Sequence, residues 1–365
     1  MAFDPSDVRE PFFSVLCGYV SNVPLRLIPD LASISFEEAH NFFLNRLLLN
    51  PHVQAYPPAE RYQILFWKWA IETLESLLDE QDAEIDDRLY NHLVNLIRCS
   101  SSSGTNPPSA SYVTYLWKSS ETQRQRASIC AGVANATLLE SRTLVERGTT
   151  GLTTWTASIS LAEFLFKHSE LVQGKRVLEL GCGAGFLGIV VATLQQRCGI
   201  ARAKEHGRPS LWLTDVDSNV LSRCQDNIQL PCNASSCHPD VHCAKLNWMD
   251  ANNPAARPSL ESTICTVNAD VIIGADIVFD PAIIPALVDT MSLIMHSGQS
   301  KSGKHIIAYI ALTVRNEETL SRFVHTSEHS LELLDISTEL VGQGILAVPR
   351  SEDQEIRLYR IQRRR

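Results

Sequence analysis

The sequence is short of positive charge and has no long apolar run. Of its 365 residues, 32 are lysine or arginine and 41 are aspartate or glutamate, which gives a formal net charge of −9. Proteins that bind nucleic acid or anionic membranes over a broad surface usually carry an excess of basic residues. No uncharged apolar stretch reaches the roughly 18 residues that a membrane-spanning helix needs. The composition therefore argues against a nucleic-acid partner and against a membrane partner.

The N-terminal residues and the cysteines also argue against secretion. The chain begins with MAFDPSDVREPFF, which has neither the basic region nor the apolar region of a signal peptide. Ten cysteines are present, and without a secretory route we expect reduced thiols rather than disulfides. We therefore expect a cytoplasmic protein. Its large, internally complete fold makes a monomer the default expectation.

One cluster of metal-ligand residue types needs its own assessment. The stretch PCNASSCHPDVHC contains Cys232, Cys237, His238, His242 and Cys243. All five side chains can bind zinc, but the paired Cys-x2-Cys spacing of structural zinc sites is absent. We assign no metal to the chain, and zinc at this cluster is the alternative.

The first hundred residues have the periodicity of amphipathic helices. The stretch SFEEAHNFFLNRLLLN begins with Ser35 and has Glu38 three residues later, which is a capping-box pattern. The stretch AERYQILFWKWAIETLESLL places Trp67 and Ile71 on one apolar stripe. Its aromatic residues could form a partner surface, but such a stripe is more often part of a core. We therefore expect packed helices here.

A change of composition separates this region from the rest of the chain. The stretch SSSSGTNPPSAS consists of small polar residues, glycine and proline, which cannot bury enough apolar surface to fold. We predict a helical domain over residues 1–100, a linker over 101–111 and a second domain over 112–365.

Short β-branched runs alternate with helical segments in the second domain. The seven expected strands lie at 176–180, 210–215, 241–248, 269–276, 304–313, 331–337 and 355–362. The expected helices lie at 186–197, 218–230, 281–296 and 317–329. This alternation predicts an α/β fold whose mostly parallel sheet is covered on both faces. Because no helix separates the last two strands, we expect an antiparallel pair at one edge.

A glycine-rich turn joins the first of these strands to the helix that follows. The stretch RVLELGCGAGFLGIVVATL contains G-x-G-x-x-G from Gly183 to Gly188, the pattern of dinucleotide-binding enzymes. Such a junction lies at the sheet edge where open α/β folds bind ligands, and glycine lets the backbone approach a ligand closely. The same junction also serves S-adenosylmethionine, so the glycines alone leave both ligands open.

Acidic and aromatic residues at successive strand ends distinguish the two ligands. Glu179 would repel a pyrophosphate, but it can bind the ammonium or ribose of S-adenosylmethionine. Asp215 can accept hydrogen bonds from both ribose hydroxyls, and Trp248 can stack on adenine. Asp276 stands at the tip of the fourth strand. Together these residues favour a cationic sulfonium cofactor, and so a methyltransferase over a dehydrogenase.

These motifs resemble those of the seven-β-strand family-16 protein methyltransferases. The matching segments are TTGLTTWTASISLAEFL, ELGCGAGFLGI, TDVD, LNW and GADIVFDP. The resemblance implies a seven-stranded Rossmann-like methyltransferase sheet with an antiparallel last strand, and S-adenosyl-L-methionine as the cofactor. The cofactor-binding residues are then Trp155, Glu179, Gly181, Cys182, Gly183, Asp215, Trp248 and Ala275.

The same resemblance implies two catalytic residues, Asp276 and Phe279. Asp276 begins the family's D-x-x-Y element, which is associated with the substrate lysine. Phe279 stands where many relatives have tyrosine, so its ring is either a wall of the lysine channel or structural packing. Because a carboxylate favours the charged form of an amine, we expect Asp276 to orient the lysine rather than to act as general base.

Further segments are similar to the branch of eukaryotic elongation factor 2 lysine methyltransferases. They are LLLNPHVQAYPPAERYQILFWKW, YVTYLWK, GTTGLTTW and IALTVRNEETLSRF. The similarity implies a lysine of translation elongation factor 2 as the substrate, and we expect the N-terminal helical domain to recognise it. The alternatives are a methyltransferase acting on another protein or a small molecule, and a non-catalytic adaptor that keeps the fold.

Overall fold

The computed structural model describes residues 10–78, 83–102, 110–118, 129–130, 132–143, 146, 148–196, 208–297, 305–340, 346 and 354–364. The chain divides into two compact units: Met1–Leu144 with Gly344–Pro349, and Val145–Gln343 with Arg350–Arg365. Most of the linker expected at 101–111 lies outside the described residues. The domain boundaries drawn from the sequence therefore stay a prediction.

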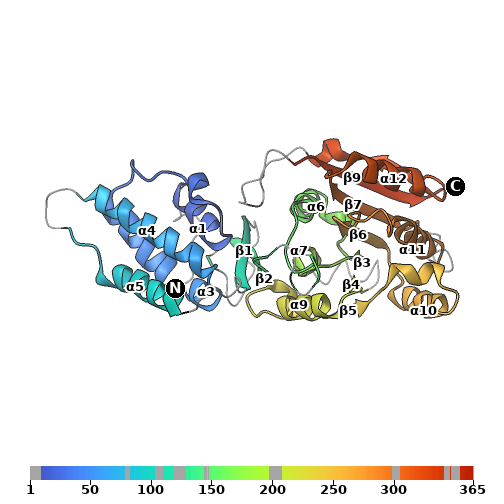
Figure 1. Cartoon of the computed structure of the whole chain (residues 1–365), viewed down its shortest axis with the longest axis horizontal. Helices are drawn as coiled ribbons and strands as arrows, with labels where there is room; N and C mark the ends of the chain where they lie inside the picture. The colour runs from blue at the N-terminus through green and yellow to red at the C-terminus, as the bar shows by residue number, and fades with distance from the viewer. Residues whose placement is uncertain are drawn as a thin grey trace. The chain divides into compact units, whose positions relative to one another are not determined.

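Helices make up most of the first unit (Figure 1). They are α1 (Phe12–Val20), α2 (Phe36–Asn41), α3 (Pro51–Ala55), α4 (Glu60–Leu77) and α5 (Asp87–Ser102), with a π-helical turn, η3 (Phe42–Leu48), after α2. Ser35 caps α2, because its Oγ accepts a hydrogen bond from the backbone N–H of Glu38 at 3.3 Å. The helix start that the capping-box pattern predicted at Ser35 is thus confirmed.

The aromatic stripe of α4 is part of the core. Phe66, Trp67 and Leu74 are buried together with Tyr19 of α1 and Phe43 of η3. The indole Nε1 of Trp67 donates a hydrogen bond to the Tyr19 hydroxyl at 3.0 Å, which satisfies the polar end of a buried ring. The expectation of core packing is confirmed.

A β-hairpin that the sequence pattern did not predict completes the first unit. Strands β1 (Ser111–Lys118) and β2 (Val133–Glu140) pair antiparallel in a two-stranded sheet. Most of their residues are buried, so the alternation of apolar and polar residues that marks a half-exposed strand is absent. Leu116 and Val133 belong to the same buried cluster as the helices.

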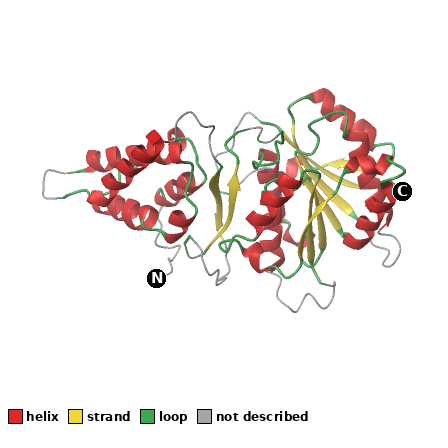
Figure 2. Ribbon diagram, turned by 60° about the horizontal axis from the view of Figure 1, so that its bottom comes forward, coloured by secondary structure: helices red, strands yellow, loops and turns green. Residues whose placement is uncertain are grey.

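The second unit is built on a seven-stranded sheet (Figures 1 and 2). The strands are β3 (Arg176–Leu180), β4 (Ser210–Asp215), β5 (Val241–Lys245), β6 (Val271–Ala275), β7 (Ile307–Thr313), β8 (Leu331–Asp335) and β9 (Ile356–Arg363), in the order β5-β4-β3-β6-β7-β9-β8. Strands β3 to β7 are parallel, and β9 is antiparallel to both neighbours. The α/β class, the seven strands and the antiparallel last strand are confirmed.

Helices cover both faces of this sheet. They are α6 (Thr156–Lys167), α7 (Phe186–Gln196), α9 (Ser218–Ile228), α10 (Arg257–Val267), α11 (Ile284–Ser297) and α12 (Glu317–Ser327). In Figure 1 the first three lie on one side of the sheet and the last three on the other. Leu178 and Ile272 of the sheet are buried in one cluster with Met291 of α11 and Phe323 of α12. Together with the parallel pairing of β3 with β4 and with β6, this packing fixes the carboxyl ends of the three strands relative to one another.

None of the helices in the described part of the chain is long and apolar enough to cross a membrane.

Candidate active site

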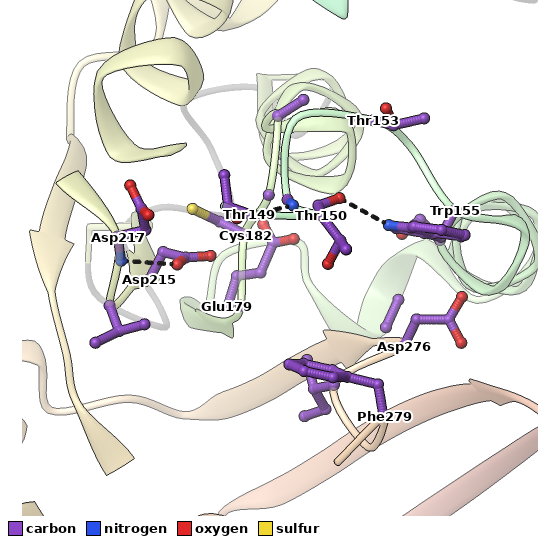
Figure 3. Close-up of a pocket in the computed structure, with 18 of the residues that line it drawn as sticks. Thr149, Thr150, Thr153, Trp155, Glu179, Cys182, Asp215, Asp217, Asp276 and Phe279 are labelled. Atoms are coloured by element: carbon purple, nitrogen blue, oxygen red, sulfur yellow. Dashed lines mark hydrogen bonds between the residues drawn. The ribbon is translucent and has the colours of Figure 1, made fainter. Parts of the chain in front are cut away.

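A pocket of about 410 Å³ lies at the carboxyl ends of β3, β4, β5 and β6 (Figure 3). All the cofactor-binding and catalytic residues predicted from the sequence line it: Trp155, Glu179, Gly181, Cys182, Gly183, Asp215, Trp248, Ala275, Asp276 and Phe279. The structure therefore brings together every predicted site residue. This is the sheet edge at which open α/β folds bind their ligands.

Two glycines of the turn after β3 line the pocket in a backbone conformation that favours glycine. Gly181 and Gly183 have φ angles of +67° and +52°, in the left-handed region that other residues avoid. A Cβ atom at Gly181 would lie 2.8 Å from Cγ2 of Ile277, and one at Gly183 would lie 3.1 Å from the carbonyl oxygen of Gly151. The main chain can therefore form one wall of the pocket at close range.

Glu179 places a buried carboxyl beside this turn. It lies on β3, is fully buried, and its Oε2 has no hydrogen-bond partner. Burial raises its pKa well above the ordinary value, and the nearby Cys243 and Asp215 raise it further. Because an unpaired buried acceptor is costly, this oxygen fits a hydrogen-bond donor or a cation supplied by a ligand.

Asp215 ends β4 and also faces the pocket (Figure 3). Its Oδ1 accepts a hydrogen bond from the backbone N–H of Asp217 at 3.1 Å. Burial raises the pKa of Asp215, while backbone hydrogen bonds from Asp217, Val216 and Gly183 oppose that rise. The main chain thus orients a carboxylate that can accept hydrogen bonds from a ligand's hydroxyl groups.

The charged groups that line the pocket are all acidic in the described part of the chain. Four carboxyl groups line it, from Glu179, Asp215, Asp217 and Asp276, and none of the described lining residues is lysine, arginine or histidine. Such a lining repels the pyrophosphate of a dinucleotide and attracts a cation. Its residues fit S-adenosylmethionine, which carries an ammonium and a sulfonium.

Three aromatic residues also line the pocket. Trp155 precedes α6, and its Nε1 donates a hydrogen bond to the carbonyl of Thr150 at 3.2 Å. Trp248 is half-buried and comes within 4 Å of the Cβ position at Gly181. Phe279 is 63% exposed. In Figure 3, Glu179 and Asp215 lie on one side of the pocket, whereas Trp155 and Phe279 lie on the other.

Asp276 already has several partners within the protein. It has a φ of +53°, and its backbone N–H donates to the carbonyl of Ala311 at 2.9 Å. Oδ1 accepts from the backbone N–H of Thr313 at 2.8 Å, and Oδ2 accepts from the Thr313 hydroxyl at 2.9 Å. Arg315 Nη2 donates to Oδ2 at 3.1 Å. The carboxylate is thus held in one orientation by the end of β7 and the residues after it.

Several lining residues were not identified from the sequence. They are Thr149, Thr150, Gly151, Thr153, Asn247 and Met249, among others. The first four belong to the Thr- and Gly-rich run GTTGLTTW, which precedes a helix. Small polar residues just before a helix indicate a loop that can contact a ligand. The sequence did not show which edge of the sheet this loop reaches.

The cysteine and histidine cluster does not converge on one point. His242 stacks on Trp212 at 4.2 Å between ring centres, and its Nε2 lies 2.7 Å from Oδ1 of Asp240. Cys232 is buried, whereas Cys237 is exposed. Among the residues that the structure describes, no group of three or more His, Cys, Asp or Glu side chains is arranged to hold a metal ion.

Comparison with known proteins agrees with this geometry. The sequence profile of a lysine methyltransferase family matches residues 139–328. Protein-lysine N-methyltransferase EFM3 of Chaetomium thermophilum is 30% identical over 291 residues, covering 79% of this chain and 78% of the relative. Protein-lysine N-methyltransferase EEF2KMT of Homo sapiens is 26% identical over 287 residues, covering 77% of this chain and 74% of the relative.

Proposed function

The chain belongs to the lysine methyltransferase family and methylates protein lysine with S-adenosyl-L-methionine as its cofactor; we propose that its substrate is a lysine of translation elongation factor 2. The observation that carries the assignment is the carboxylate-lined pocket, in which Glu179 keeps a buried oxygen without a partner. The ammonium group of a cationic cofactor would supply the hydrogen-bond partner that this oxygen lacks.

The residues of the pocket divide between two tasks. Glu179 binds the ammonium of the cofactor, Asp215 accepts hydrogen bonds from its ribose hydroxyls, and Trp248 packs on its adenine. The glycine turn, from Gly181 to Gly183, lets the main chain approach closely. When bound, S-adenosylmethionine supplies an electrophilic methyl group.

The other task is to present the substrate amine. Phe279 lies exposed on the pocket wall, where its ring can pack on the apolar stem of a lysine and exclude water from it. Asp276 orients the amine. Lysine has an ordinary pKa of about 10.4, so the amine must lose a proton before it can attack, and an apolar channel favours the neutral form.

The choice of elongation factor 2 is supported by how far the sequence similarity extends. The family profile covers residues 139–328, whereas the matches to EFM3 and EEF2KMT cover 79% and 77% of the chain. Similarity therefore continues outside the segment that contains the pocket. The described residues outside the catalytic segment do not line the pocket and can contact a protein substrate instead. The N-terminal helices lie in that part of the chain, so we assign substrate recognition to them.

Labelling in a cell extract tests the substrate. Purified protein and tritiated S-adenosylmethionine are added to extract from cells that lack this chain, with the Asp215→Ala variant as the control. We expect one labelled protein band, of the size of elongation factor 2, and a much weaker band with the variant at limiting cofactor. Labelling of other proteins or of small molecules would contradict the substrate. An absence of labelling, with the cofactor still bound, would favour a non-catalytic adaptor.

Surface substitutions test the role of the N-terminal helices more sharply than a deletion. A deletion would uncover Leu116 and Val133, which share the core of the helices. Tyr90 and Val94 are exposed on α5, and Leu334 is an exposed control on β8. If α5 contacts the substrate, Tyr90→Ser with Val94→Ser raises the KM for elongation factor 2 and leaves cofactor affinity unchanged. Equal KM values for this pair and for Leu334→Ser would contradict that role.

We also propose a cytoplasmic, monomeric enzyme with neither a nucleic-acid partner nor a membrane partner. The acidic balance of the chain, with a net charge of −9, supports this proposal. Sedimentation of the purified protein at the mass of one chain, 40.6 kDa, is the expected result. A dimer at micromolar concentration would contradict it.

A further inference from the structure

Arg315, just beyond β7, contacts two residues that line the pocket but is not itself part of the lining. Its Nη2 lies 3.1 Å from Oδ2 of Asp276. Its guanidinium carbon lies 4.8 Å from the centre of the Trp155 ring, within the range of a cation–π interaction. The Arg315 side chain is 43% exposed, whereas that of Asp276 is only 4% exposed. A half-exposed cation therefore bridges a buried carboxylate and an aromatic wall.

The charge of Arg315 matters because of what a lone carboxylate does to an amine. A carboxylate near a lysine favours the ammonium form, which has no lone pair and cannot attack a methyl group. Among the described residues, the ionisable side chains that line the pocket are those of Glu179, Cys182, Asp215, Asp217 and Asp276. Four of them are carboxyl groups. All four would stabilise an ammonium, and Asp276 lies on the same side of the pocket as Phe279 (Figure 3).

Arg315 is placed to offset the effect of Asp276. Its positive charge lies within hydrogen-bond distance of the carboxylate and on the face of Trp155. Thr313 supplies two further hydrogen bonds to the same carboxylate, but no charge. The pair of Asp276 and Arg315 is electrically neutral as a whole, while its oxygens keep a fixed orientation.

We propose that Arg315 is a positioning residue for methyl transfer: it neutralises Asp276 and fixes Trp155, so that the substrate lysine is oriented without being kept protonated. The inference rests on the lysine methyl transfer assigned to this pocket. Arg315 acts through its two neighbours and needs no contact with the reacting atoms. The proton leaves the amine for solvent before the nitrogen attacks, and Arg315 takes no part in that transfer.

The pH dependence of kcat tests this role, because kcat reports ionisations in the enzyme–substrate complex. In Arg315→Met the carboxylate is left uncompensated. We expect the midpoint of the acid limb to rise by about one pH unit, the scale on which one nearby charge shifts a pKa. Below the midpoint, kcat should then fall about tenfold. In Arg315→Lys the charge is kept, so the midpoint should return to that of the unaltered enzyme.

Arg257→Met is the matched control. Arg257 is 48% exposed and pairs with Glu261 at 2.9 Å on α10, and it does not line the pocket. Its removal should leave the midpoint unchanged. A midpoint does not depend on the amount of folded enzyme when that amount is the same at every pH, and circular dichroism at each pH checks this for every variant.

The outcomes separate this inference from the choice of substrate. A lower kcat with an unchanged midpoint in Arg315→Met would show a structural role and overturn the inference, as would a shifted midpoint in Arg315→Lys. If the unaltered enzyme labels a protein other than elongation factor 2, the substrate is wrong, and the profile is measured on that protein. If it labels no lysine at all, both proposals are overturned.

Discussion

At the scale of single residues, Glu179 combines full burial with an oxygen that has no hydrogen-bond partner. Burial raises its pKa well above the ordinary value, which is about 4.3 for glutamate. The contribution of this group to the free energy of unfolding therefore has its full value below about pH 4. It is lost as the pH rises towards the folded-state pKa. Above that pH, the folded protein without a bound cation is therefore destabilised by the ionisation of Glu179.

Glu179→Gln should relieve that loss, because glutamine does not ionise. Without cofactor, we expect the melting temperature of the unaltered protein to fall below that of the variant as the pH rises from 4 to 8, with no such change at pH 4 and below. With cofactor the order reverses, since the variant lacks the charge that binds the ammonium. Thermal melting at several pH values measures both effects. Glu261→Gln, an exposed control, should show neither, and a pH-independent difference would contradict the account.

Asp215→Ala should weaken cofactor binding by about 1.5–3 kcal/mol, the scale of hydrogen bonds to a charged group. Isothermal titration calorimetry gives the affinity directly. Asp226, which is exposed on α9 and outside the pocket lining, provides the matched alanine control. Unchanged affinity in Asp215→Ala would remove this residue from the site.

The sequence predicted the residues of the pocket better than it predicted their partners. Glu179 and Asp215 follow from their places at the ends of expected strands, because parallel strands end at one edge. The bonds from Thr313 and Arg315 to Asp276 join segments far apart in the chain. They depend on β6 and β7 being neighbours in the sheet, which no local pattern reveals.

At the scale of elements, the turn between β3 and α7 determines whether the pocket forms. Gly181→Ala would add strain at a φ of +67° and place a Cβ atom 2.8 Å from Ile277. Gly148 has a φ of +80° and nothing within 4 Å of its Cβ position; because it also lines the pocket, it serves as a control for strain in the stability measurement only.

We expect Gly148→Ala to cost about 1–2 kcal/mol of stability, which is the cost of the left-handed conformation. Gly181→Ala should cost about 1–3 kcal/mol more because of the clash, and it should also lose cofactor affinity. Urea unfolding measures the stability and calorimetry the affinity. Equal stability losses in the two variants would show that contact with Ile277 does not constrain the turn.

The limits of the sequence pattern are also visible among the elements. Strands β3 to β7 were expected because β-branched runs alternate with helical segments. The hairpin of β1 and β2 was missed, since its strands are buried with little alternation. The order of the last strands was also beyond the pattern: β9 lies between β7 and β8, and strand order depends on which edges can pair in the folded sheet.

At the scale of the whole molecule, each of the two units has its own buried cluster. One includes Tyr19, Phe66 and Leu116, and the other includes Leu178 and Ile272. Separate cores can unfold in separate steps. Every described residue that lines the pocket belongs to the second unit.

Calorimetric melting should therefore show two transitions, of which the cofactor raises one. At a cofactor concentration of one hundred times Kd, the stabilisation should be about 2.7 kcal/mol, confined to the second unit. Asp215→Ala should reduce this shift without moving the other transition. A single transition that shifts as a whole would contradict the independence of the two cores.

The measurement that tests the central claim most directly is mass spectrometry of purified elongation factor 2 after incubation with this protein and S-adenosylmethionine. The account predicts methyl groups on lysine, in amounts that rise with enzyme concentration, and far fewer when Asp215→Ala replaces the unaltered enzyme at limiting cofactor. Elongation factor 2 that stays unmodified, while the same enzyme preparation binds the cofactor, would contradict it.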